Sequence, residues 1–290
     1  MVFKFKSYQN FKKKLGEANS IVALNELAVR DFQYRANSSE QGASEYIAEK
    51  STQFNICVNF DKFPDFSVDL AQRYIVSIYE GTEEFYNNFI KEYQSFKQKL
   101  NDNELTLEAK EENTNKDKKK TLADVLKLLD KNYIKNCNNW EFYNSGERLI
   151  GKIPMSIYVY YTEIRHRVIH PYDKKVKELN NARSRLISFR SEIQESYKVP
   201  DIPSEFEQIN FEDFVLFSRV VKDIALKLSQ IGCPTDKELI DLVGRNKKIG
   251  KFKNNPKAWR RALVGEICCI YGVDRKEAYD IIDRVLGSLA

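Results

Sequence analysis

A chain of 290 residues that is 42% hydrophobic and 31% charged has the composition of an ordinary globular protein, with room for one large or two modest domains. No segment approaches the roughly 20 consecutive apolar residues of a membrane-spanning helix, and the first residues lack a signal-peptide pattern, so we expect a cytoplasmic protein that binds no membrane. The five cysteines show no C-x-x-C spacing, which argues against a disulfide framework or a cysteine-rich zinc site, and the net charge of +5 only weakly indicates an anionic partner.

The first half of the chain has the hydrophobic periodicity of helices. We expect one helix across residues 8–35, followed at 54–60 by a short strand or a loop. From 67 to 100, apolar residues recur every three, four or seven positions, which is typical of one face of a long helix, with Gly81 as a candidate interruption. Residues 101–120 contain no aromatic residue and alternate in charge, which favours an exposed insertion.

Helical patterns continue in the second half. A helix is expected over 121–134, a pause over the polar residues 135–147, and a new helix from about Ile153. A long, highly charged helix should follow over 172–198 and end before the two prolines of "VPDIPSE", which mark the clearest boundary in the chain.

Beyond that boundary we expect four shorter helices. Two of them begin with capping-box signatures, Thr235 with Glu238 and Asp274 with Glu277. The patterns together predict an all-α protein in three parts: an N-terminal helical region (1–66), a helical bundle with a long charged helix pair (67–198) and a basic C-terminal helical domain (199–290).

The strongest local charge lies between Arg245 and Arg261, where eight basic residues occur without an acidic one. Such a cluster attracts phosphates, and an aromatic ring within it offers a stacking face for unpaired bases. The alternative, that Trp259 packs in the core and the charges form a solvated face, stays open. The candidate RNA-binding residues of this basic segment are Lys247, Lys248, Lys251, Lys253, Trp259, Arg260 and Arg261.

Both histidines of the chain lie in one short stretch, "TEIRHRVIHPYD", residues 162–173. Pro171 disfavours the α conformation for His170, so this stretch should end or kink its helix. The simplest interpretation is a structural helix end that contains two imidazoles without a functional role. A second is a zinc site, because His166 and His170 are about 40° apart around a helix and Glu163 lies one turn earlier, although two arginines would flank the cation.

The third interpretation is phosphodiester chemistry. Metal-independent RNA cleavage needs a base that titrates near neutrality, which histidine supplies, and a fixed cation for the charge on phosphorus, which arginine supplies in a planar fork. Arg165 and His170 have these roles available. They are five residues apart, about 140° around a helix, so they converge only through the long arginine side chain and the geometry at Pro171.

The run from Arg165 to His170 resembles the R-x4-H motif of the HEPN superfamily, in which a polar residue follows the arginine; His166 occupies that place. The apolar helix before the motif and the charged helix after it are also similar to that family. The resemblance covers roughly residues 67–198 and implies a HEPN-like helical bundle. By position, it makes Arg165 and His170 catalytic and makes His166 an auxiliary polar residue. Arg167, in the same stretch, is a further candidate RNA-binding residue.

The resemblance further implies a metal-independent endoribonuclease, with no cofactor, that cleaves single-stranded RNA or tRNA as a toxin or antiviral-defence effector. HEPN domains usually pair to form one cleft, and this chain has no further histidine for a second motif, so a homodimer through the motif helices is implied. An inhibitor, an antitoxin or a larger defence complex is a possible further partner. The alternative is a catalytically inactive HEPN-like module that binds RNA or protein.

Overall fold

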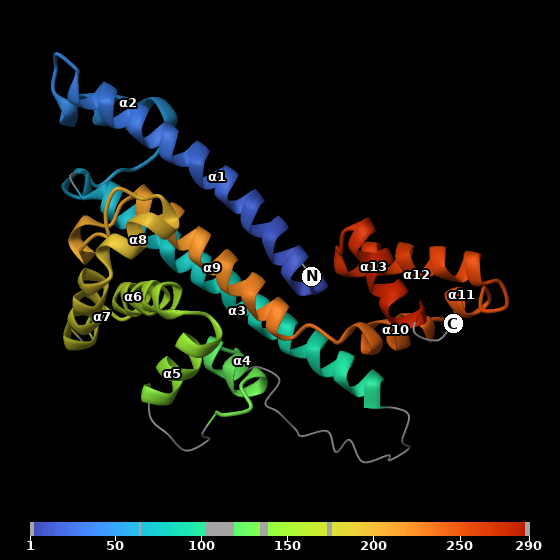
Figure 1. Ribbon diagram of the computed structural model, residues 1–290. Coiled ribbons are helices and arrows are strands. Elements are labelled where there is room, and N and C mark those ends of the chain that lie inside the picture. Colours follow the sequence, from blue (N-terminus) through green and yellow to red (C-terminus); the bar gives the residue numbers. More distant parts are fainter. Residues whose placement is uncertain (1–2, 64, 102–118, 134–138, 173–175, 288–290) are drawn as a thin grey trace. The chain divides into compact units, whose positions relative to one another are not determined.

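The computed structural model describes residues 3–63, 65–101, 119–133, 139–172 and 176–287 (Figure 1). Within these ranges the secondary structure consists of α-helices and two short 3-10 helices, without strands, so the all-α prediction is confirmed. The predicted insertion at 101–120 lies almost wholly outside the described residues. The α-helices are α1 (Lys6–Asn37), α2 (Ala43–Phe54), α3 (Phe66–Asn101), α4 (Leu122–Leu129), α5 (Asn139–Leu149), α6 (Lys152–Ile169), α7 (Val176–Ser188), α8 (Arg190–Tyr197), α9 (Phe211–Ile231), α10 (Asp236–Gly244), α11 (Lys247–Gly250), α12 (Pro256–Tyr271) and α13 (Arg275–Leu286), with 3-10 helices at Phe60–Lys62 and Phe206–Gln208.

The chain divides into two compact units that do not follow the three predicted parts. Unit 1 comprises residues 1–12, 81–155 and 222–290, and unit 2 comprises residues 13–80 and 156–221. The predicted boundary at the "VPDIPSE" prolines therefore falls inside unit 2. Helices α1, α3, α6 and α9 each contribute residues to both units.

In unit 2 the core forms around α6. Its residues 156–161 are all buried, on every side of the helix, as expected of a helix enclosed by others. The ring of Tyr158 stacks on Tyr79 of α3 with centroids 6.2 Å apart, and the ring of Tyr161 lies 4.7 Å from Phe217 of α9. Aromatic packing therefore fixes α6 between these two long helices.

A buried carboxylate completes this core. Asp213, in the first turn of α9, is only 3% exposed. Its Oδ1 accepts hydrogen bonds from the Tyr161 hydroxyl (2.8 Å) and the Ser204 backbone N–H (2.9 Å), and its Oδ2 accepts one from the Asn210 N–H (3.0 Å). A charge at this depth is tolerated only because these donors replace water.

In unit 1, a second buried carboxylate joins α4 to α5. Asp130 accepts hydrogen bonds from the Ser145 hydroxyl (2.6 Å) and the Arg148 guanidinium (2.6 Å), and Arg148 also contacts the buried Glu141 carboxylate at 2.9 Å. Elsewhere in unit 1, α10, α12 and α13 pack together around buried aliphatic side chains.

Three sequence predictions in the helical middle of the chain were wrong. Gly81 does not interrupt α3, because its missing side chain costs only about 1 kcal/mol of helix propensity and the buried residues on both sides outweigh it. Of the polar stretch predicted as a pause, the described residues 139–147 belong to α5, which is anchored by Asp130. The charged helix predicted over 172–198 is two helices, α7 and α8, separated at Phe189.

Other local predictions are confirmed, wholly or in part. Residues 55–59 form a loop, and Thr235 with Glu238 forms the predicted capping box of α10. Asp274 caps α13, but its carboxylate accepts from the N–H of Lys276 instead of Glu277. No helix in the described ranges is long and apolar enough to cross a membrane.

Replacing Tyr161 by Phe should destabilise the protein by about 1.5–3 kcal/mol, because the buried Asp213 carboxylate loses one of its three donors. Burial, reinforced by Asp213, raises the pKa of Tyr161 well above 10, so its hydroxyl is a donor throughout the neutral range. Urea unfolding measures the change. The control is Tyr172→Phe, at a side chain 97% exposed, and equal stability of the two variants would contradict the expectation.

The Asp130 network should make stability depend on acid. Burial alone raises the pKa of Asp130, but hydrogen bonds from Ser145, Arg148 and the Asn132 N–H outweigh it and hold the pKa below the usual 3.8. Because the pKa of Asp130 is lower in the folded than in the unfolded state, ionised Asp130 stabilises the fold at pH values above the unfolded-state pKa. This stabilisation is lost as the pH falls below that pKa. Urea unfolding between about pH 5 and pH 3 should therefore show a shallower loss of stability for Asp130→Asn than for the wild type. Parallel curves would contradict this.

Candidate functional site

The motif predicted from the sequence lies at the last turn of α6 in unit 2. The helix ends at Ile169, and the His170 backbone N–H donates to the His166 carbonyl at 2.8 Å, which closes that turn. Pro171 follows and cannot continue the helix because it lacks an N–H group. The expected helix end is therefore present, and it exposes His170.

The two imidazoles are neighbours at this helix end. Their ring centroids are 5.0 Å apart with the planes inclined by 49°, as the spacing of four residues predicts. They line an open pocket of about 520 Å³ together with Ile169, Pro171 and Tyr172. The arrangement leaves His170 accessible to a ligand from solvent.

Arg165 lies in a different environment from the histidines. It is half-buried, and its guanidinium carbon sits 5.1 Å from the centre of the ring of Tyr79 on α3. Its Nε is buried without a hydrogen-bond partner, and none of the carboxylates in the described ranges forms an ion pair with it. A cation that is partly desolvated and stacked but unpaired retains its capacity to bind an anion.

Arg167 contrasts with Arg165. Its guanidinium pairs with Glu207 at 3.1 Å and covers the ring of Phe206 at 4.1 Å. These contacts tie the last turn of α6 to the segment before α9. An RNA phosphate would have to compete with Glu207 for Arg167, whereas Arg165 has no such competitor among the residues described.

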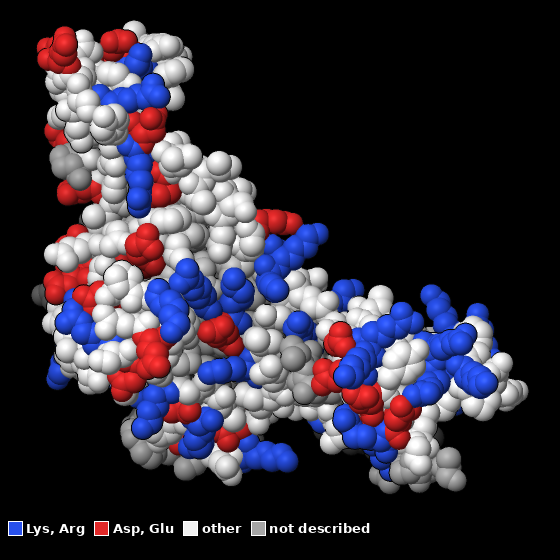
Figure 2. Space-filling view, turned by 45° about the horizontal axis from the view of Figure 1, so that its top comes forward, with Lys and Arg blue, Asp and Glu red and all other residues white. Residues whose placement is uncertain are grey.

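The basic segment belongs to unit 1, and its cationic side chains differ in whether a carboxylate already pairs with them. Arg260 pairs with Asp283 and lies over the ring of Tyr279, while Trp259 is half-buried against Gly244 with its indole N–H unpaired. Figure 2 shows Lys and Arg gathered over the part of unit 1 that carries α11 and α12, with acidic side chains beside them. The exposed basic residues of the predicted set are Lys247, Lys248, Lys251, Lys253 and Arg261.

The zinc interpretation gains no support from the geometry. In the described parts of the chain, no three or more His, Cys, Asp or Glu side chains are arranged to hold a metal ion. Glu163, His166 and His170 are therefore not gathered as a set of ligands.

Sequence reasoning missed Tyr79, which supports the Arg165 guanidinium. Tyr79 belongs to the apolar pattern of α3, and no local signal connects it to a motif so distant in the chain. Its buried ring, 8% exposed, is also stacked on Tyr158. The position of Arg165 thus depends on the packing of α6 against α3.

The fold and site define an all-α protein with an arginine–histidine motif at an exposed helix end. No protein-family model, curated protein or solved structure matches the chain. The interpretation of the site rests on the chemistry of its own residues.

Replacing Arg165 by Met should leave the melting temperature unchanged or raise it. Methionine keeps an unbranched side chain against Tyr79 and removes a buried Nε that has no partner. The matched variant Arg148→Met should lower the melting temperature, because it leaves the carboxylates of Asp130 and Glu141 without their shared cation. Thermal unfolding by circular dichroism compares them, and a clear loss in Arg165→Met would assign Arg165 a structural role.

Proposed function

We propose that this protein is a HEPN-type, metal-independent endoribonuclease that acts on single-stranded RNA or tRNA in the cytoplasm, as a toxin or antiviral-defence effector. The observation that carries the proposal is the unpaired, half-buried Arg165, in the same motif as the exposed His170. A cation without a carboxylate partner and an accessible imidazole are the two groups that RNA cleavage without metal requires.

In the proposed reaction His170 takes the proton from the ribose 2′-hydroxyl, whose oxygen attacks the adjacent phosphorus. The guanidinium of Arg165 binds the non-bridging oxygens, where negative charge develops. The bond from phosphorus to the 5′-oxygen breaks, and that oxygen takes up the proton that the imidazolium of His170 returns. The products are a 2′,3′-cyclic phosphate and a 5′-hydroxyl. His166, 5.0 Å from His170, orients or assists the base.

The site is proposed to be completed by a second copy of the chain. Residues five apart are about 140° apart around a helix, and Arg165 faces Tyr79 while His170 lies in solvent beyond the helix end. Two α6 ends that face each other would offer two arginines and four histidines to one groove. A homodimer through the motif helices, held inactive by an inhibitor or within a defence complex, is therefore part of the proposal.

One observation favours the alternative of a non-catalytic interaction module. In unit 2 an apolar cavity of about 510 Å³ lies among α1, α2 and the segment after α2, lined by side chains such as Phe32, Phe54 and Phe63. On α1, Leu24 and Leu27 are also more than two-thirds exposed. Apolar surface of this kind is typical of protein contacts.

The test is cleavage of end-labelled single-stranded RNA and tRNA in the presence of EDTA. Replacing His170 by Ala, or Arg165 by Met, should reduce the rate by about 100-fold or more, because each removes a group that acts in the transition state. His166→Ala should cost less. Arg165→Lys should recover only part of the activity, since lysine keeps the charge but not the fork.

The matched control is Arg190→Met, at an exposed arginine of unit 2 that pairs with Asp201, and it should cleave like the wild type. Activity that EDTA abolishes, or that survives His170→Ala, would refute the mechanism. RNA binding without cleavage by a dimer of verified mass would favour the non-catalytic alternative.

A further inference from the structure

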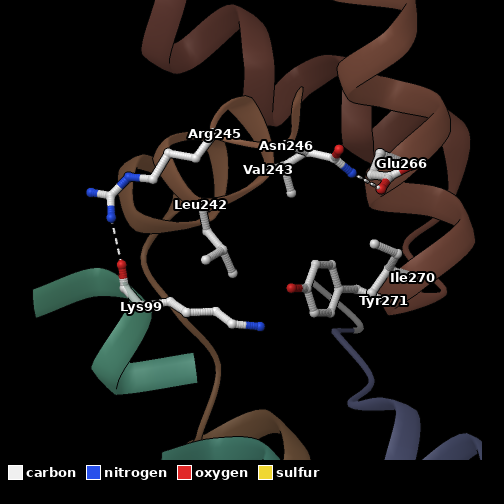
Figure 3. Close-up of a pocket in the computed structure, with 8 residues that line it drawn as sticks. All are labelled: Lys99, Leu242, Val243, Arg245, Asn246, Glu266, Ile270 and Tyr271. Atoms are coloured by element: carbon white, nitrogen blue, oxygen red, sulfur yellow. Dashed lines mark hydrogen bonds between the residues drawn. The ribbon is translucent and has the colours of Figure 1, made fainter. Parts of the chain in front are cut away.

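A third cavity, of about 660 Å³, lies wholly within unit 1 (Figure 3). This is within the range of about 300–1,000 Å³ that small-molecule sites occupy. The end of α3, helix α10 with the residues after it, and the last turns of α12 form its walls. It is lined by Lys99, Leu242, Val243, Arg245, Asn246, Glu266, Ile270 and Tyr271.

One side of this cavity is cationic. The Lys99 ammonium extends into the open space (Figure 3), and it pairs with no carboxylate in the parts of the chain that the structure describes. The Arg245 guanidinium lies at the other end of this lysine, where it donates to the Lys99 backbone carbonyl and ties α10 to the end of α3 (Figure 3). An anion in the cavity would meet Lys99 first.

A hydroxyl points toward the same space. The ring of Tyr271 is buried and stacks on Phe3 with centroids 4.7 Å apart, which leaves its hydroxyl directed into the cavity (Figure 3). No hydrogen-bond partner for it exists among the described residues. Burial, then the nearby Glu92 and Glu266, raises the pKa of Tyr271 to about 12, so the hydroxyl stays a donor at neutral pH.

The opposite side offers an acceptor and apolar contact. Glu266 Oε1 accepts a hydrogen bond from the Asn246 amide at 2.8 Å, which orients the carboxylate and leaves Oε2 available. Ile270, near Tyr271, and Leu242, on the side of Lys99, provide apolar surface (Figure 3). The cavity thus combines donors for an anion, apolar walls and an acceptor for N–H groups.

We propose that this cavity binds one unpaired nucleotide of a single-stranded RNA. The phosphate is held by Lys99 and the Tyr271 hydroxyl, the base lies against Leu242 and Ile270, and its N–H edge donates to Glu266. Arg245 and Asn246 begin the basic segment, so its exposed lysines are positioned to bind the phosphates of neighbouring nucleotides. The inference rests on the proposed function only in taking RNA as the ligand, and it is independent of cleavage.

The carboxylate of Glu266 also predicts a base preference. Cytosine, adenine and guanine present an exocyclic amino group, which a carboxylate accepts well. Uracil presents a single N–H between two carbonyl oxygens, which repel the carboxylate. We therefore expect oligo(A) and oligo(C) to bind about tenfold more tightly than oligo(U), the size of a modest base-edge contact.

The test is fluorescence anisotropy with labelled oligo(A), oligo(C) and oligo(U), using the full chain with His170→Ala so that RNA stays intact. Adding Lys99→Gln should lower the affinity for each of the three oligonucleotides by about tenfold. Because one phosphate contact is lost, the slope of log affinity against log salt concentration should also shrink by about 0.7. Glu266→Gln should remove the preference over oligo(U). The matched control is Lys97→Gln on the same helix, at a lysine that pairs with Glu238 outside the cavity, and it should bind as the parent does.

Equal affinity for the three oligonucleotides, or indifference to Lys99→Gln, would overturn the proposal. Displacement of oligo(A) by AMP at equal concentration would also overturn it, because the cavity would then serve free nucleotides. Cleavage by the wild type is measured separately. If the wild type does not cleave RNA but the oligonucleotides bind with the expected preferences, only the ribonuclease proposal is refuted. If it cleaves RNA and those preferences are absent, only the nucleotide pocket is refuted.

Discussion

The candidate site in unit 2 depends on the burial of one carboxylate, Asp213. A charge that is 3% exposed must keep its donors, and these come from the Tyr161 hydroxyl on α6 and from the backbone N–H groups of Ser204 and Asn210 before α9. The network therefore allows α6 little freedom to slide or rotate against α9. Because the motif occupies the last turns of the same rigid helix, the constraint at Asp213 also sets where Arg165 meets the ring of Tyr79.

The described cations fall into two groups by their partners. Arg148, Arg167 and Arg260 each contact a carboxylate, and these pairs join elements of the fold. Arg165 and Lys99 contact none of the described carboxylates, although the first is half-buried and the second extends into a cavity. Partial desolvation without a counter-charge costs free energy, and the proposed contact of Arg165 with an RNA phosphate would offset that cost. Lys99 is exposed, so it stays hydrated and incurs no such cost.

Much of the fold follows from local patterns, and its departures have physical causes. The long helices α1, α3 and α6 and the cap at Thr235 were predictable because periodicity and capping act within a few residues. The continuation of α3 through Gly81 was not predictable, because burial in the tertiary structure outweighs a helix-propensity penalty of about 1 kcal/mol. Helix α5 was missed because its polar sequence is anchored by Asp130, and the composition of the segment does not reveal that partner.

The sites divide in the same way between local and long-range causes. The spacing of His166 and His170 and the presence of Pro171 predicted neighbouring rings at a helix end, because these depend on one turn of helix. The basic segment looked uniform in sequence, yet Arg260 is engaged by Asp283, 23 positions away, and Arg245 by a carbonyl 146 positions away. The electrostatic role of a basic run is decided by acceptors elsewhere in the fold. A sequence can therefore show where positive charge accumulates, but only the structure shows which of those charges remain available to a phosphate.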